Sequence, residues 1–109
     1  MKEKFLVVYV TASSKEVGAH IAKVLLEQRL IACANLIESV QSFYNWQGEM
    51  HIDKEVLMVL KTRADLFQDK LVPAIEALHP YEVPEIIAVP IEMGAQNYMN
   101  WLEEATSKK

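Results

Sequence analysis

Four short stretches of the chain are apolar at almost every position, and this limits the folds that the chain can adopt. They are Phe5–Val10, Leu30–Ile37, Val56–Leu60 and Ile86–Ile91. A strand with one wet face alternates apolar and polar residues, so strands without this alternation are covered on both faces. Two of three expected helices can cover one face of a four-stranded sheet. We infer that further copies of the chain cover the other face. The alternative is that the third helix covers part of that face within the same chain.

Segments with the residue spacing of helices lie between some of these apolar stretches. Segments 14–28 and 62–78 each carry an apolar residue every three or four positions, which predicts amphipathic helices. Ser13 and Glu16 have the spacing of a capping box at the start of the first helix. Pro73 lies inside the second segment and predicts a kinked or split helix, because proline removes a helical hydrogen bond.

The remaining segments complete a recognisable order of strands and helices. The second apolar stretch continues through residues 39–45 to a turn around Gly48, and residues 51–62 return as the third strand. Residues 95–105 form a short final helix. We therefore predict an α+β, ferredoxin-like βαββαβ fold with an antiparallel sheet, a long hairpin between strands two and three, and an extra C-terminal helix. Pro90 cannot donate to a ladder and favours an edge position for the fourth strand.

Composition narrows the class of protein. The chain has 109 residues, of which 51% are hydrophobic and 24% charged, and we predict one domain over residues 1–109. Its net charge of −4 argues against a nucleic-acid partner, which usually selects a basic surface. A single cysteine excludes an intrachain disulfide. No apolar segment approaches the ~20 residues of a membrane span. We expect a cytoplasmic protein with no membrane partner.

His79 is the strongest candidate metal ligand. It ends the second helix, before a stiff connector that carries Glu82 and Glu85, and an imidazole near two carboxylates suits a borderline divalent ion. The alternative is a histidine that only caps the helix C-terminus. We predict that Cys33 is a buried, inert thiol. The chain has no CxxC, HExxH, EF-hand or glycine-rich phosphate motif.

Taken together, several motifs resemble the CutA family, the divalent-cation tolerance proteins. The motifs are Thr11-Ala12, Ala32-Cys33-Ala34-Asn35-Leu36-Ile37, Ser42-Phe43-Tyr44-Asn45-Trp46-Gln47-Gly48, Leu60-Lys61-Thr62, His79-Pro80-Tyr81-Glu82-Val83-Pro84-Glu85-Ile86 and Tyr98-Met99-Asn100-Trp101-Leu102. The HPYxVPEI segment combined with the Y-x-W-x-G turn is highly specific. The resemblance implies a ferredoxin-like subunit of a homotrimer, similar in architecture to the PII signalling proteins, with a role in tolerance of divalent metals, copper included.

The resemblance also bears on the metal ligands. Copper-binding relatives have been given a cysteine near the end of strand one and two adjacent histidines before the Pro-Tyr as ligands. Here His79 matches the second histidine, while Leu78 and Val10 stand at the other two positions. We therefore expect a trimeric tolerance protein with weak binding of Cu(II) or another divalent cation at His79, helped by Glu82, by Glu85 or by another copy of the chain.

A second function is also compatible with the sequence. Trp46, Lys61, Tyr81 and Trp101 are candidates to bind a small anionic ligand between subunits, as in a regulatory module of PII type. The alternative for the aromatic residues is interface packing. An acylphosphatase-like enzyme would need an arginine in a glycine-rich loop after strand one, and residues 11–14 contain neither. We therefore expect neither catalysis nor an organic cofactor.

Overall fold

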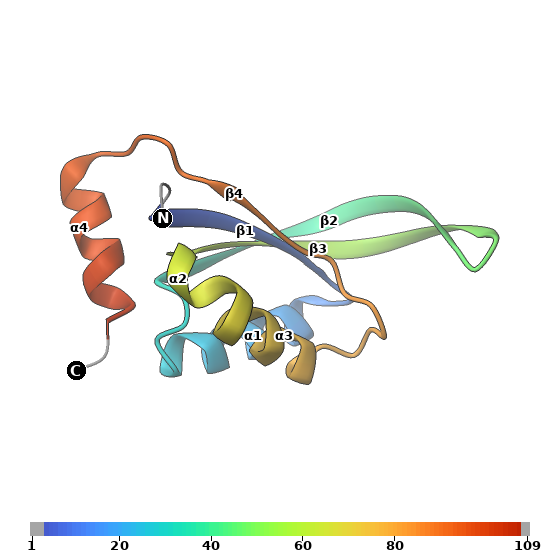
Figure 1. The fold of residues 1–109 in the computed structure, drawn as a ribbon. Helices are drawn as coiled ribbons and strands as arrows, with labels where there is room; N and C mark the ends of the chain where they lie inside the picture. The colour runs from blue at the N-terminus through green and yellow to red at the C-terminus, as the bar shows by residue number, and fades with distance from the viewer. Residues whose placement is uncertain (1–3, 108–109) are drawn as a thin grey trace.

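Figure 1 shows a four-stranded antiparallel sheet whose helices lie mainly on one face, and a hairpin that extends beyond them. The computed structural model describes residues 4–107. The elements are β1 (Phe5–Ala12), α1 (Lys15–Glu27), β2 (Cys33–Trp46), β3 (Glu49–Arg63), α2 (Ala64–Leu66), η1 (Phe67–Leu71), α3 (Val72–Leu78), β4 (Ile86–Pro90) and α4 (Gln96–Ala105). The predicted ferredoxin-like order, long hairpin and C-terminal helix are confirmed.

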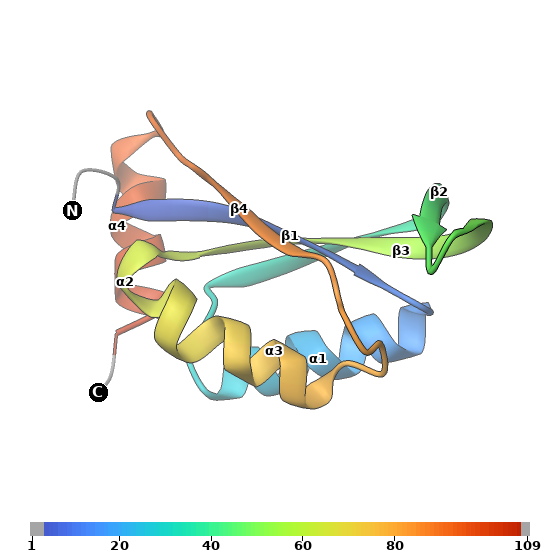
Figure 2. The same ribbon diagram turned by 45° about the vertical axis from the view of Figure 1, so that its right-hand side comes forward.

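The strand order places the most apolar strands at the centre. The order is β2-β3-β1-β4, and β1 pairs antiparallel with both β3 and β4. Pro90 pairs with Leu6 at the end of edge strand β4, as its missing N–H predicts. Figure 2 shows α1 and α3 side by side beneath one face of the sheet. The main core between these layers includes Val8, Val10, Met58, Leu60, Ile21, Leu25, Leu71 and Ile75, all fully buried.

The other face of the sheet is largely uncovered. Val7 and Tyr9 of β1 point to this face, and their register partners are Lys61 and Val59 of β3, with Val89 and Ile87 of β4. Ile37, Ile87 and Val89 are 50%, 53% and 44% exposed. Helix α4 covers only the end of the sheet opposite the hairpin tip, where Leu102 packs with Phe5 and Ala32 (Figure 1). Apolar strands therefore have one open face in the single chain, although their sequence pattern predicts cover on both faces.

The second predicted helix is split just before Pro73. A five-residue π turn, η1, separates α2 from α3, and Pro73 lies in the first turn of α3. A proline ring crowds the carbonyl four residues earlier, and the wider π turn relieves that crowding. The start of α1 differs by one residue from the prediction. Ser14, not Ser13, is the cap, and its side chain accepts a hydrogen bond from the Val17 N–H at 3.1 Å.

The hairpin contains two backbone features that fix its register. Gln47 and Gly48 have φ values of 52° and 81°, as the two-residue turn between Trp46 and Glu49 requires. Nearer the sheet, the pairing jumps from Ile37 with Leu57 to Val40 with Glu55, so β2 holds one extra residue. This β-bulge includes Ser39, whose φ is 64°.

Candidate functional site

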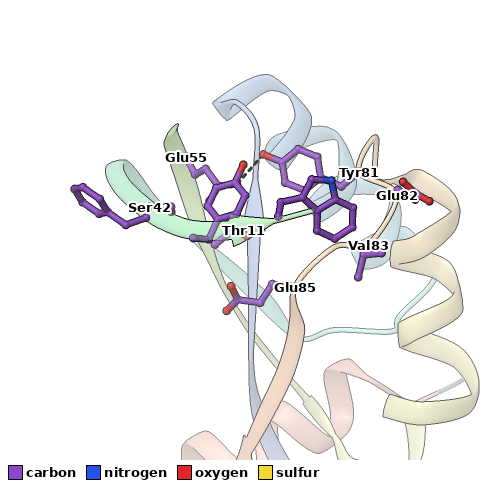
Figure 3. Close-up of a pocket in the computed structure, with 10 residues that line it drawn as sticks. Thr11, Ser42, Glu55, Tyr81, Glu82, Val83 and Glu85 are labelled. Atoms are coloured by element: carbon purple, nitrogen blue, oxygen red, sulfur yellow. Dashed lines mark hydrogen bonds between the residues drawn. The ribbon is translucent and has the colours of Figure 1, made fainter. Parts of the chain in front are cut away.

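A cleft of about 530 Å³ opens between the hairpin and the connector from α3 to β4 (Figure 3). The sheet contributes Thr11 from β1, Ser42, Phe43, Tyr44 and Trp46 from β2, and Glu55 from β3. The connector contributes Tyr81, Glu82, Val83 and Glu85. Pockets of this size are large enough to enclose a small organic molecule.

The bulge at Ser39 determines which hairpin side chains reach the cleft. Side chains alternate between the two faces of a strand, so one inserted residue changes the face of everything beyond it. Because of the bulge, Ser42 and Tyr44 lie on the same face as Ile37, and they pair with Asp53 and His51. The bulge itself was not predictable from the pattern of apolar residues.

A buried carboxylate forms part of the cleft wall. Glu55 is only 8% exposed, and its Oε2 accepts a hydrogen bond of 2.6 Å from the Tyr81 hydroxyl. A buried charge needs such a partner, since removal from water is costly. Burial, followed by the hydrogen bond to Glu55, raises the pKa of Tyr81 far above its ordinary value. Tyr81 therefore remains a hydrogen-bond donor across the physiological pH range.

A second phenol and carboxylate pair lies farther out on the hairpin. The Tyr44 hydroxyl donates a hydrogen bond to Asp53, and this bond raises the pKa of Tyr44. The Tyr44 ring stacks on His51, with ring centroids 5.4 Å apart and an interplanar angle of 16°. These contacts hold the Tyr44 ring in a fixed orientation at the cleft.

His79 is buried and both of its ring nitrogens are engaged. Nδ1 accepts a hydrogen bond from the Tyr81 N–H at 3.1 Å, which assigns the ring proton to Nε2. Nε2 then donates to the Thr11 carbonyl at 2.8 Å. The His79 N–H also bonds to the Ile75 carbonyl at 2.9 Å, so His79 ends helix α3. A metal ion at this imidazole would have to displace one of the two ring hydrogen bonds.

The three predicted metal ligands are near one another in sequence but differ in environment. Glu82 and Glu85 are exposed and line the cleft, while His79 is 8% exposed beneath the connector. Within residues 4–107, no group of three or more His, Cys, Asp or Glu side chains is placed to hold one metal ion. The metal role of these three residues stays a prediction.

The four residues predicted for an anionic ligand are not brought together within one subunit. Trp46 and Tyr81 both line the cleft. The Lys61 Nζ donates to the Asn35 Oδ1 at 3.1 Å on the uncovered sheet face. Trp101 lies on α4, with its ring centroid 5.5 Å from that of Tyr98. Among residues 4–107, three carboxylates and no basic residue line the cleft, so the charge of these residues does not favour an anionic ligand.

One prediction about a side chain needs revision, and one residue of the cleft was not predicted at all. Cys33 is half-buried at the start of β2, not fully buried, and its sulfur lies 3.6 Å from the Tyr98 hydroxyl. Sequence reasoning also missed Glu55. The available signal was an acidic residue beginning the most apolar part of a strand, where a charge is retained only with a specific partner.

Comparisons of the sequence with a family model and with known proteins point to the same family. The family model described as "CutA1 divalent ion tolerance protein" matches residues 6–105. The chain is 48% identical over 100 residues to the divalent-cation tolerance protein CutA of Thermus thermophilus, covering 92% of this chain and 96% of that protein. It is 39% identical over 101 residues to the chloroplastic protein CutA of Arabidopsis thaliana, where 93% of this chain matches 55% of that protein.

Solved structures agree with the sequence comparison. The chain superimposes on Cut A1 from Thermus thermophilus with a TM-score of 0.90 at 46% identity, covering 94% of this chain and 99% of that one. A CutA structure from Archaeoglobus fulgidus, described as periplasmic, gives a TM-score of 0.90 at 36% identity, with the same coverage of 94% and 99%. Within residues 4–107, no helix is both long and apolar enough to cross a membrane.

Proposed function

Because this chain belongs to the CutA1 divalent ion tolerance protein family, we propose that it acts in the cellular response to divalent metal ions. The observation that carries this proposal is the family match over residues 6–105, which includes the hairpin, the connector and all of the sheet except Phe5. The names of the relatives describe tolerance and not catalysis, and we propose that this chain is likewise not an enzyme. We also propose a single domain over residues 1–109 and a cytoplasmic location.

The proposed metal interaction is weak binding of Cu(II) or another divalent cation at His79, Glu82 and Glu85. Two exposed carboxylates supply negative charge at the cleft, and the imidazole beneath them is a ligand type that copper accepts. Both ring nitrogens of His79 are hydrogen-bonded, so binding must first free one of them. This cost is the reason that weak binding is proposed.

Calorimetric titration with Cu(II) tests the metal proposal. We expect His79→Ala to lower the affinity about tenfold or more, as loss of a coordinating or supporting residue usually does. His20→Ala is the matched control, since His20 is exposed on α1 and outside the cleft. The double variant Glu82→Gln with Glu85→Gln keeps the buried histidine contacts and should weaken binding as well. Equal affinity in all of these variants would exclude this site.

We propose that the protein is a homotrimer, with the uncovered sheet faces turned inward. The uncovered face carries Val7, Tyr9, Ile37, Leu57, Val59, Ile87 and Val89. Covering about seven such side chains, each already partly shielded, would contribute on the order of 5 kcal/mol per copy. That is comparable with the whole stability of a small domain, roughly 5–15 kcal/mol. Closed cyclic assembly is the usual way in which identical chains cover such a face.

A further inference from the structure

A lysine lies on the uncovered sheet face, among side chains that are mostly apolar. Lys61 of β3 pairs with Cys33 of β2 and with Val7 of β1, and Val59 precedes it on the same face. Its Nζ donates a hydrogen bond of 3.1 Å to the Asn35 Oδ1, which is a neutral acceptor. Within residues 4–107, no carboxylate lies within ion-pair distance of Lys61. The charge of this lysine is therefore not neutralised by the chain that carries it.

In the homotrimer proposed above, this charge needs a partner. Turning the sheet faces inward removes Lys61 from water together with its apolar neighbours. A lysine that leaves water loses its hydration, and this loss is offset only when a carboxylate pairs with it. The ammonium group has three N–H donors, of which the Asn35 amide oxygen accepts one. A carboxylate of a neighbouring copy is the partner that this lysine requires.

Glu85 is the carboxylate that fits this role. It directly precedes β4, and the alternation of strand residues places it on the same face as Ile87 and Val89. Glu85 is exposed, and among residues 4–107 no lysine or arginine pairs with it. Figure 3 shows it apart from the hydrogen bond between Glu55 and Tyr81.

The acidic residues of β3 on this face are less suitable. Glu55 already accepts a hydrogen bond from the Tyr81 hydroxyl. Asp53 accepts one from the Tyr44 hydroxyl. Glu49 is the first residue of β3, at the tip of the hairpin, and so lies far from the apolar side chains of the sheet face. Glu85 is thus the carboxylate that is both near those side chains and available.

Lys61 and Glu85 of the same chain cannot meet. Lys61 lies opposite Val7, whereas the register of β4 places Glu85 level with Thr11, and both Thr11 and Glu85 line the cleft. Positions 7 and 11 are about 13 Å apart along the strand, and two strand spacings add about 10 Å across the sheet. A lysine side chain does not span this distance. The two opposite charges therefore lie toward opposite ends of one face.

We infer that Lys61 of each copy forms an ion pair with Glu85 of a neighbouring copy. Contacts in a cyclic trimer join two different patches of the chain, so the lysine end of one face meets the carboxylate end of the next. The ion pair fixes which parts of the two faces come together, and it makes a second chain part of the cleft wall. This inference rests on the homotrimer proposed above.

Charge reversal tests the ion pair. Lys61→Glu and Glu85→Lys each bring like charges together at every contact of the trimer. We expect each to raise the concentration at which the trimer dissociates by about tenfold or more, measured by light scattering on dilution in urea. The double variant restores opposite charges and should recover most of the loss. Single variants without effect, or a double variant without recovery, would overturn the inference.

Two controls carry the same charge changes away from the sheet face. Lys23→Glu and Glu27→Lys are exposed on α1, on the opposite side of the sheet, and should leave the dissociation unchanged. If charge reversal unfolds the chain, Lys61→Met and Glu85→Gln provide a second test, because the double variant of a true pair loses less than the sum of its single variants. Additive losses would refute the pairing.

The same measurements separate this inference from the homotrimer itself. A wild-type protein that scatters light as a single chain would reject the trimer and the ion pair together. A wild-type trimer whose dissociation is indifferent to substitution of Lys61 and Glu85 would reject the ion pair alone.

Discussion

Among single residues, Glu55 and Tyr81 form a partly buried hydrogen bond across the cleft. They come from a strand and a connector 26 positions apart, and their hydrogen bond joins the hairpin to the segment before β4. We expect Tyr81→Phe to reduce the free energy of unfolding by about 1–3 kcal/mol, because it leaves a buried carboxylate without its donor. Urea denaturation measures this change.

A matched control separates this bond from the loss of any tyrosine hydroxyl. Tyr98 is 42% exposed and its hydroxyl lies near the Cys33 sulfur, a weak hydrogen-bond partner. Tyr98→Phe should change the unfolding free energy by less than about 0.5 kcal/mol. A similar loss in both variants would contradict a special role for the Glu55 and Tyr81 pair.

The raised pKa of Tyr81 leads to a second prediction about a single residue. The folded protein holds the phenol proton more tightly than the unfolded chain, in which tyrosine titrates at about pH 10. The stabilising contribution is therefore complete below about pH 10 and is lost as the pH rises above it. Melting temperatures measured across this range should fall more steeply for the wild type than for Tyr81→Phe, and parallel curves would contradict the assignment.

The sequence identified several cleft residues but not their partners. Trp46, Tyr81, Glu82 and Glu85 were singled out because of residue type and a stiff connector, and all four line the cleft. The residues next to each of them in the sequence are enough to suggest a binding role. The bond between His79 and the Thr11 carbonyl joins positions 68 residues apart, so no local pattern could indicate it. Contacts between residues so far apart in the sequence depend on how the helices pack on the sheet.

Among the elements, the bulge in β2 controls the orientation of the outer hairpin. The two-residue turn at Gly48 and the break at Pro73 were predictable, because glycine and proline have strong local preferences. The bulge was not, since Ser39 has no such preference. It is nevertheless decisive, because without the extra residue the Ser42 and Tyr44 side chains would leave the cleft face.

Substitution of Ser39 tests the bulge. Ser39 has a φ of 64°, a conformation in which a β-branched residue is strained. We expect Ser39→Val to cost about 1–3 kcal/mol of stability, whereas Ser39→Gly should be neutral or slightly stabilising. Thermal melts of the two variants provide the comparison, and equal melting temperatures would show that the left-handed conformation is not required.

For the whole molecule, the uncovered sheet face is the dominant feature. Unbroken apolar runs predicted a sheet covered on both sides, whereas the single chain covers one side and only one end of the other. The sequence could indicate this mismatch, because it follows from comparing the two apolar faces of the sheet with the number of helices that could cover them. The sequence left open whether the final helix covers part of this face, since that depends on the direction of the loop after β4.

A charge placed on the uncovered face tests the proposed assembly. Ile87 is 53% exposed in the subunit, and Ile87→Lys should shift the mass in light scattering from three times the chain mass of 12.4 kDa to the chain mass itself. Leu26→Lys is the control, because Leu26 is 42% exposed on α1, on the opposite side of the sheet. Dissociation of both variants, or of neither, would contradict an interface at the sheet face.

The elongated outline of the subunit, 44 × 26 × 25 Å, has a practical consequence for experiments. Helix α4 stands at the end opposite the hairpin tip, and Lys4 contacts Glu103 of that helix across 3.8 Å (Figure 1). Both ends of the described chain therefore emerge far from the ligand cleft. A fluorescent dye, affinity handle or surface tether attached at either end would leave the cleft between the hairpin and the connector free for measurement.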